Sequence, residues 1–425
     1  MIAISRSRGR ALLAGALMLN LAVLVGCQSA KMPDPMRAVW VTRMDYRTPE
    51  DVTNIMENCS SAGFNTVLFQ VRGNGTVFYN SKIEPWAEQF DFQNPGFDPL
   101  ALAIQEAHNR NLQIHAWVNV MPAWQGPKEP SARAQEIVKA LDSADEAKKD
   151  AILAAAANQL YYTHPDWFWY DADGDRQPLD HVVGEHQRGW YVSLNPCLPE
   201  VRAYLVSVFK ELVTHYDVDG LHMDYIRFPN EPVVPGEEIP DYPRDQRTLE
   251  LFASATGETP ESNPEAWNAW RTARVTELVG DIHAMMRRNA RGKALSASVG
   301  AVRANGLRHY QDGEAWMTHG YVDAVFLMNY TPDPQTFNSR IDPWLAVDSA
   351  TRVVPGMMVR RNGSRATDIA TCEELINTAR RRTGDFCIFA YSSIFGRGQR
   401  RARAADDLRP ELVDYLDGLA DTDGN

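Results

Sequence analysis

Eight apolar runs recur along the chain, and segments with helical periodicity separate most of them. The runs are rich in Val, Ile, Leu and aromatic residues, as parallel strands are when both faces of the sheet are covered. They span residues 37–43, 65–71, 112–120, 218–226, 294–302, 322–330, 352–359 and 385–393. Eight strands alternating with helices over roughly 400 residues predict a (β/α)₈ TIM-type barrel.

The clearest helical segment spans residues 199–215, where Pro199 occupies the first turn and Val201, Leu205 and Leu212 recur on one face. We expect the other helices at residues 51–62, 98–109, 267–289, 312–319, 335–349, 367–381 and 406–419. A doubly wound open sheet is the alternative fold. It lacks support, because RGNGTVF at 72–78 has no third glycine of a dinucleotide-binding loop.

Two connections are much longer than the others. Residues 121–196 follow the third run and residues 230–263 follow the fourth. Both insertions are therefore expected at the C-terminal face of the barrel, where this fold builds active sites. The first contains an Ala-rich helical stretch over 132–160 and then a hairpin that turns at Asp173 and Gly174. Its aspartates are not spaced as in a calcium loop, so we interpret it as a plain turn.

The first 26 residues have the form of an export signal. Three arginines precede an apolar run over residues 11–25, which is short for a membrane span. The run ends in Leu-Val-Gly-Cys, as in bacterial lipoprotein signals. We expect lipidation of Cys27, a linker over residues 27–35 and a barrel domain at 36–425. An ordinary secretory signal is the alternative. Gln28 favours the outer membrane, facing the periplasm, if the cell has two membranes.

The net charge is −12, and it becomes −15 without the first 26 residues, which hold three arginines and no acidic residue. Such an acidic protein is not expected to bind nucleic acid or to dock electrostatically on anionic lipid. Besides Cys27, the chain has Cys59, Cys197, Cys372 and Cys387. Disulfides and buried thiols are both open, and none of the four is spaced like a zinc ligand.

The fourth run, DVDGLHMDYIRFP at 217–229, places titratable side chains in an otherwise apolar strand. Because side chains alternate along a strand, His222 and Asp224 share one face, and Leu221 and Met223 share the other. Leu and Met suit the helix-facing side, so His222 and Asp224 are expected on the barrel axis. We predict Asp224 as the catalytic carboxylate at the C-terminal mouth, with His222 beside it. A loop-capping aspartate and a core histidine are the structural alternatives.

Other strand ends carry polar side chains at the same mouth. By the same alternation, Gln70 and Arg72 share a face at the end of the second run, and strand one ends with Arg43 and Asp45. Amide, guanidinium and aromatic groups suit a polyhydroxylated ligand such as a sugar. The predicted substrate-binding residues are Asp45, Gln70, Arg72, His115, Trp117, Asn119, Arg227, Asn329 and Tyr330.

Glycoside hydrolysis usually needs a second carboxylate, unless an N-acetyl group of the substrate replaces it. The candidates near strand ends are Asp45, Glu84, Asp312, Glu314 and Asp333. Seven of the aromatic residues in the first insertion form either stacking platforms for a glycan or a small core. They are Trp124, Trp167, Phe168, Trp169, Tyr170, Trp190 and Tyr191. The chain contains neither G-x-S-x-G nor H-E-x-x-H, and nothing in it indicates a metal or organic cofactor.

Five stretches together resemble the family 10-like glycosyl hydrolases, bacterial barrel proteins that are often lipoproteins. They are RAVWVTRMDY, GFNTVLFQVRGNGTVFYNSKIEPWAE, FDPLALAIQEAHNRNLQIHAWVNV, SLNPCLPEVRAYLVSVFKELVTHYDVDGLHMDYIRFP and DAVFLMNY. The resemblance implies a TIM-type barrel that acts on glycans. For envelope members it implies peptidoglycan strands, including strands stripped of their peptides.

The family signatures fall on three strands of this chain. They cover Gln70, Val71 and Arg72 in the second run, His115, Ala116, Trp117 and Asn119 in the third, and Asp219, Gly220, His222, Asp224 and Tyr225 in the fourth. The chain departs from the family pattern at two places. Tyr225 follows Asp224 where many relatives have a second acid, and Asn329 stands where many have Gln.

The sequence therefore predicts an exported, lipid-anchored glycoside hydrolase with Asp224 as its catalytic carboxylate. A non-catalytic carbohydrate-binding envelope protein is the competing hypothesis, and the missing second acid favours it. A transglycosidase, which would give products longer than its substrate, is a third.

Overall fold

The computed structural model describes residues 32–141, 145–179, 182–183, 187–188, 191–228, 241–359, 364–396 and 409–423. The predicted export signal, Cys27 and Trp190 lie outside these residues. In the part of the chain that is described, no helix combines the length and the apolarity that crossing a membrane requires.

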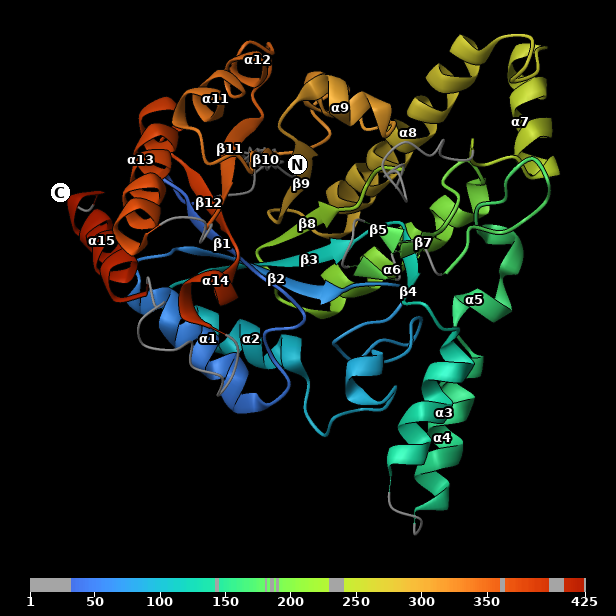
Figure 1. Cartoon of the computed structure of the whole chain (residues 1–425), viewed down its shortest axis with the longest axis horizontal. Helices are drawn as coiled ribbons and strands as arrows, with labels where there is room; N and C mark the ends of the chain where they lie inside the picture. Colours follow the sequence, from blue (N-terminus) through green and yellow to red (C-terminus); the bar gives the residue numbers. More distant parts are fainter. Residues whose placement is uncertain are drawn as a thin grey trace, which may run out of the picture.

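Eight parallel strands close into a barrel in the order β1-β12-β11-β10-β9-β8-β3-β2, and helices pack around it (Figure 1). Each predicted run forms one strand: β1 (Arg37–Val41), β2 (Thr66–Arg72), β3 (Gln113–Asn119), β8 (Gly220–Asp224), β9 (Ala294–Gly300), β10 (Ala324–Met328), β11 (Arg352–Met358) and β12 (Phe386–Phe389). The TIM-type barrel is confirmed. Pairing of β1 with both β2 and β12 closes the sheet, which removes the edges that an open sheet would expose.

The barrel helices lie close to the predicted positions, and α6 (Pro199–His215) has the predicted bounds. The others are α1 (Pro49–Ser61), α2 (Pro99–His108), α8 (Pro264–Asn289), α10 (Gly313–Thr318), α13 (Arg365–Thr383) and α15 (Arg409–Asp423). Helix α8 begins three residues earlier than predicted because the Asn263 side chain caps it.

The single helix predicted at 335–349 is wrong. The structure has α11 (Pro334–Ser339) and then α12 (Asp342–Leu345). Pro343 has no N–H to donate, so it cannot continue a helix from α11 and instead lies in the first turn of a new one. Helical elements without a sequence prediction are η1 (Glu88–Phe90), α5 (Leu160–Thr163), η2 (Pro165–Trp167), α7 (Gln246–Thr256), α9 (Arg303–Arg308) and α14 (Tyr391–Phe395).

The first insertion forms a small antiparallel sheet and a helical arm. Strand β4 (Pro122–Gln125) pairs with β7 (Tyr191–Ser193), and a short ladder joins β5 (Val182–Val183) to β6 (Gln187–Arg188). Helix α4 (Glu146–Ala157) falls within the predicted Ala-rich stretch, and α3 (Pro130–Ala140) begins two residues before it. Both helices project away from the barrel (Figure 1).

The predicted turn at Asp173 is a plain hairpin. Asp171 Oδ1 accepts hydrogen bonds from the backbone N–H groups of Asp173 and Asp175 at 3.0 and 2.9 Å. Tyr170 and Arg176 form an antiparallel bridge beside it. Among the described residues, no three His, Cys, Asp or Glu side chains converge as metal ligands would.

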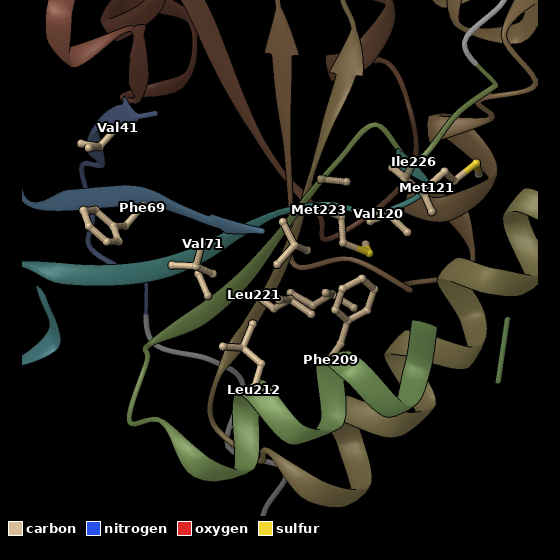
Figure 2. Close-up of a cluster of buried hydrophobic side chains, with 14 of the residues drawn as sticks. Val41, Phe69, Val71, Val120, Met121, Phe209, Leu212, Leu221, Met223 and Ile226 are labelled. Atoms are coloured by element: carbon tan, nitrogen blue, oxygen red, sulfur yellow. The ribbon is translucent and has the colours of Figure 1, made fainter. Parts of the chain in front are cut away.

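Apolar side chains pack on both faces of the barrel wall. Figure 2 shows Phe209 and Leu212 of α6 against Leu221 and Met223 of β8, which confirms the predicted helix-facing side of that strand. A second cluster fills the axis and comprises Met36, Ala38, Trp40, Leu68, Trp117, Ala324, Phe326, Val354 and Cys387. With both faces covered by apolar groups, a polar side chain on the axis needs a specific partner.

Cys59, Cys197, Cys372 and Cys387 are all buried, and the structure joins none of them in a disulfide. Burial raises the pKa of Cys59, Cys197 and Cys387, because the thiolate loses its hydration in an apolar surrounding. The structure therefore favours the thiol alternative over disulfides for these four residues.

Candidate active site

The register of β2, β3 and β8 arranges the axial polar side chains in layers. Trp117 pairs with Gln70 and with His222, and Asn119 pairs with Asp224 one layer nearer the C-terminal mouth. The ring of His222 contacts the axial side chains of Trp40 and Phe326. The predicted axial position of the face that carries His222 and Asp224 is thus confirmed.

Asp224 ends β8 with one oxygen held and one free. The backbone N–H of Tyr225 donates to Oδ1 at 2.7 Å, and Arg227 Nη1 donates to the same oxygen at 3.2 Å. Oδ2 has no hydrogen-bond partner among the described residues. Two donors on one oxygen fix the orientation of the carboxyl group, so Asp224 can present Oδ2 to a ligand.

Tyr225 sets this geometry through an unusual backbone. Its φ is +48°, a left-handed conformation that costs a non-glycine residue about 1–2 kcal/mol. Its ring lies 4.4 Å from the Arg227 guanidinium and packs edge-on against Tyr191 at 4.9 Å between centroids. These contacts hold the turn that directs the Tyr225 N–H onto Asp224. Strand alternation gave no indication of the turn, and Tyr225 was not among the predicted site residues.

A hydrogen-bonded network joins the ends of β1, β2 and β3 at the mouth. Gln70 donates to Asn119 Oδ1 at 3.0 Å and accepts the backbone N–H of Arg43 at 3.1 Å. Asn119 Nδ2 donates to the carbonyl of Gly73 at 3.0 Å and to the Tyr191 hydroxyl at 3.3 Å. The structure therefore brings Gln70 and Asn119 together, as predicted, and adds Tyr191 from the first insertion.

His222 lies one layer below Asp224 and is fully buried. Trp40 Nε1 can only donate, and it lies 3.1 Å from His222 Nε2. Nε2 is therefore an acceptor, and Nδ1, 2.9 Å from Ser296 Oγ, carries the proton. Burial and then the nearby His115 lower the pKa of His222 well below its ordinary value. A neutral ring held on both sides fits a supporting position beneath the site.

His115 and Trp117 also lie inside the barrel. His115 pairs with Gly220, and a Cβ at Gly220 would lie 2.6 Å from His115 Nδ1, so only glycine leaves room for the ring. Burial lowers the pKa of His115 to about 4, although the charge of Asp219 opposes the shift. Trp117 is 3% exposed, and its Nε1 has no partner among the described residues. Of the two, Trp117 lies nearer the mouth.

The prediction that Arg72 shares a face with Gln70 is wrong. The β2–β3 register shifts between Gln70 and Arg72, as in a β-bulge, which turns Arg72 toward α6. Its guanidinium forms a two-point ion pair with Glu84 at 2.7 and 2.6 Å, and both side chains are fully buried. Tyr204 of α6 donates to the same carboxylate at 3.1 Å. Arg72 therefore holds the loop after β2 against the barrel.

Three other residues that were predicted to bind substrate contact neighbouring residues of the protein. Asp45 Oδ2 accepts the N–H and the hydroxyl of Thr42, both at 2.8 Å, and closes the turn after β1. Asn329 is fully buried and donates to the Phe337 carbonyl at 2.9 Å. Tyr330 packs on the ring of Phe389 at 5.5 Å between centroids, and burial and then the charge of Asp224 raise its pKa well above the ordinary value.

The other candidate carboxylates for the second catalytic group are engaged elsewhere. Glu84 pairs with Arg72, and Asp312 and Asp333 cap the first turns of α10 and α11. Glu314 is paired with Arg303. Among the described residues, Asp224 is the one predicted catalytic carboxylate that keeps an oxygen toward the mouth.

The aromatic residues of the first insertion divide between the two expected roles. Trp124, Phe168 and Trp169 are fully buried, and Trp169 donates to the Leu194 carbonyl at 3.0 Å, so these three form the insertion's own core. Tyr191 instead reaches the mouth. Its strand, β7, pairs with β4, which directly follows β3 in the chain. The aromatic residues of the insertion after β3 were the sequence signal for a group at this position.

A large cavity in the described part of the chain lies away from these side chains. It has a volume of about 970 Å³ and is lined by Asp323, Arg352 and Asp385 at the N-terminal ends of β10, β11 and β12. Active sites of this fold lie at the opposite end of the strands, and the converging polar groups are also there. We therefore place the candidate site at the C-terminal mouth.

A closed parallel barrel that presents a carboxylate at its C-terminal mouth defines a TIM-barrel protein with an enzyme-like site. The chain belongs to the glycosyl hydrolase-like 10 family, whose model matches residues 35–373. This confirms the family that the sequence resembles.

Two curated relatives are similar to most of the chain. The sequence is 25% identical over 346 residues to glycosyl hydrolase YngK of Bacillus subtilis and 25% identical over 336 residues to glycosyl hydrolase DigH of Escherichia coli. The matches cover 74% and 70% of this chain, but 57% and 66% of the relatives. The chain thus spans less than two thirds of either relative.

Solved structures with similar folds include two glycoside hydrolase barrels. The glycoside hydrolase domain of PgaB from Bordetella bronchiseptica has a TM-score of 0.56 at 11% identity, covering 86% of this chain and all of that one. The catalytic domain of β-amylase from Paenibacillus polymyxa has a TM-score of 0.54 at 10% identity, covering 93% and 99%. At these identities the likeness shows the fold alone.

Proposed function

We propose that the protein is a glycoside hydrolase of the bacterial cell envelope that cleaves glycosidic bonds in peptidoglycan glycan strands. The observation that carries the proposal is the Asp224 carboxylate, fixed through Oδ1 and open at Oδ2 at the mouth of the barrel. Membership of a glycosyl hydrolase-like family and two relatives named glycosyl hydrolases support it.

In this proposal Asp224 acts on the reacting sugar, and the groups around it position the substrate. Arg227 holds Oδ1 of Asp224 in place, and Gln70 and Asn119 hold the shape of the mouth. His222, one layer below Asp224 on the same strand, supports the position of Asp224. An N-acetyl group of the substrate supplies the nucleophile in place of a second carboxylate: its carbonyl oxygen attacks the anomeric carbon while Asp224, as general acid, gives its proton to the departing sugar oxygen. Water then opens the resulting oxazolinium ion and returns a proton to Asp224.

The experiment compares two isosteric variants, Asp224→Asn and Asp333→Asn. The purified proteins are incubated with intact and with peptide-stripped peptidoglycan, and released material is identified by mass spectrometry. Asp333 is an exposed helix cap, and asparagine also caps helices, so its variant controls for the loss of one charge. Asp224→Asn should reduce turnover by about 1000-fold or more with a near-unchanged melting temperature. Full activity in Asp224→Asn would refute the assignment.

A non-catalytic carbohydrate-binding protein is the second candidate, and the engagement of the other candidate acids in caps and ion pairs favours it. This alternative predicts saturable retention on the glycan with no new reducing ends. The same incubation separates the two functions.

We also propose that the protein is exported and anchored by lipid on Cys27. The sequence of residues 1–27 supports this. Metabolic labelling with a fatty acid, compared between the wild type and Cys27→Ser, tests it. If the cell has two membranes, fractionation should place the protein in the outer one.

A further inference from the structure

Arg43, two residues beyond the end of β1, is a buried cation that forms no ion pair with a described carboxylate. It is 4% exposed. Its Nη2 donates to Gln125 Oε1 at 2.7 Å and to the Tyr191 hydroxyl at 3.1 Å, and both partners are neutral. Nε is buried without a partner, and Nη1 makes no hydrogen bond to any described residue. Within the described residues, no carboxylate oxygen forms an ion pair with this guanidinium.

The surrounding chain is built to hold the guanidinium in this place. A Cβ at Gly73 would lie 2.5 Å from Arg43 Nε, so glycine is needed where the loop after β2 passes the side chain. Gln125 comes from β4 and Tyr191 from β7, so the small sheet of the first insertion supplies both acceptors. Gly73, the first glycine of the RGNG stretch, thus leaves room for the Arg43 side chain.

Two acidic residues of this region, Asp45 and Glu88, are hydrogen-bonded to other partners. Asp45 accepts two hydrogen bonds from Thr42, and Glu88 accepts one from Arg133 at 3.2 Å. Arg47 adds further positive charge: burial, together with the charge of Arg43, lowers the pKa of Arg47. Two arginines thus lie near the end of β1 with Asp45 and Glu88 close to them, and both of these carboxylates are hydrogen-bonded to groups other than Arg43.

The position also belongs to the candidate active site. Tyr191, which accepts from Arg43, also accepts from Asn119 and packs against the Tyr225 ring beside Asp224. A buried charge without a counter-charge destabilises a fold. Locally unfavourable groups of this kind are expected at functional sites, where a ligand compensates them.

We propose that Arg43 binds a carboxylate carried by the glycan, so that the site selects an acidic sugar beside the bond that Asp224 acts on. The inference rests on the proposed function and names the chemistry of its substrate. The carboxylate has two possible sources: the lactyl group of muramic acid in peptide-stripped peptidoglycan, or a uronic acid. Guanidinium and carboxylate pair through charge-assisted hydrogen bonds in both cases.

The test uses each acidic glycan beside its own carboxyl-reduced form, in which a neutral alcohol replaces the carboxylate. KM, kcat and equilibrium binding are measured for peptide-stripped peptidoglycan strands and for a polyuronate. The wild type should show a KM about 10- to 100-fold higher for the reduced form of its preferred glycan. The glycan that shows this ratio identifies the source of the carboxylate.

Two variants locate the effect on Arg43. Arg43→Gln should lose the preference for the acidic form, whereas Arg47→Gln, which removes the same charge from a neighbouring side chain, should keep it. Equal binding of acidic and reduced glycans by the wild type would overturn the inference while leaving hydrolysis intact. An Arg43→Gln variant that loses activity equally on the acidic and the reduced glycan, and melts at a lower temperature, would also overturn the inference. Arg43-dependent binding without cleavage would support the inference and refute the proposed hydrolysis.

Discussion

Two buried arginines show why residue type alone did not assign a role at this site. Arg72 donates to both oxygens of Glu84, whereas Arg43 has only neutral partners. Arg72 ends β2 and Arg43 follows β1, and the sequence predicted Arg72 as a substrate-binding residue. Their partners come from loops and insertions that fold back on the strand ends, so the difference between them arises in the tertiary structure.

The Arg72–Glu84 pair should be structural. Arg72→Met leaves a buried carboxylate without a counter-charge, and we expect the free energy of unfolding to fall by about 3–5 kcal/mol. The double variant Arg72→Met/Glu84→Gln should recover part of this loss, because no unpaired charge remains. Urea unfolding measures both changes. An Arg72→Met variant of normal stability that binds glycan poorly would instead support the original substrate-binding prediction.

The two buried histidines should make the fold sensitive to acid. Folding lowers the pKa of His115 to about 4 and also lowers that of His222, so the unfolded chain binds their protons more readily. The contribution of the two neutral histidines to the free energy of unfolding is complete above pH 6.5. It is lost as the pH falls toward their pKa values in the folded protein. Each histidine contributes a slope of about 1.4 kcal/mol per pH unit in this range.

Unfolding free energies measured at intervals between pH 7 and 4.5 test this prediction. His115→Leu removes one titrating ring, so the difference between its slope and that of the wild type isolates the histidine from the carboxylates that titrate over the same range. Identical slopes would show that His115 is not buried in neutral form.

At the scale of single elements, alternation along a strand was accurate for β8 and failed for β2. In β8, Leu221 and Met223 pack on α6 while His222 and Asp224 face the axis, because the strand is regular. In β2 the register shift after Gln70 turns Arg72 to the helix side. A bulge depends on the pairing of two strands, so the residues Gln70, Val71 and Arg72 do not by themselves indicate one.

Tyr225 gives a test of the turn after β8. Tyr225→Gly and Tyr225→Ala both remove the ring, but only glycine adopts a φ near +48° without strain. We expect the glycine variant to be more stable than the alanine variant by about 1 kcal/mol. Thermal unfolding of the pair measures this difference. A more stable alanine variant would contradict the left-handed conformation.

At the scale of the whole molecule, contacts between distant segments close the barrel. Asp385 accepts the N–H of Met36 at 2.8 Å and pairs with Arg352 at 2.5 Å, and Arg352 also reaches Asp34 at 3.1 Å. These residues join the start of β1 to β11 and β12. The number and order of the strands predicted closure, but the sequence did not indicate which charged residues would meet at the bottom of the barrel.

The four described cysteines give a prediction at this scale. In a Cys27→Ser variant, we expect no reaction with a thiol reagent in the native state and four reactive thiols after unfolding, because all four are buried. A reducing agent should leave the melting temperature unchanged. A lower melting temperature on reduction would show that a disulfide forms in the exported protein.

The sequence by itself determined the barrel, its eight strands, most of its helices and the position of Asp224. These follow from hydrophobic periodicity and strand alternation, which are local properties of the chain. The tertiary structure alone decided which polar groups reach the mouth. It turned Arg72 away, buried His222 beneath Asp224, and brought Tyr191 and Gln125 onto Arg43. Such partnerships join residues far apart in the chain, and they depend on register, bulges and insertion folding that no local pattern encodes.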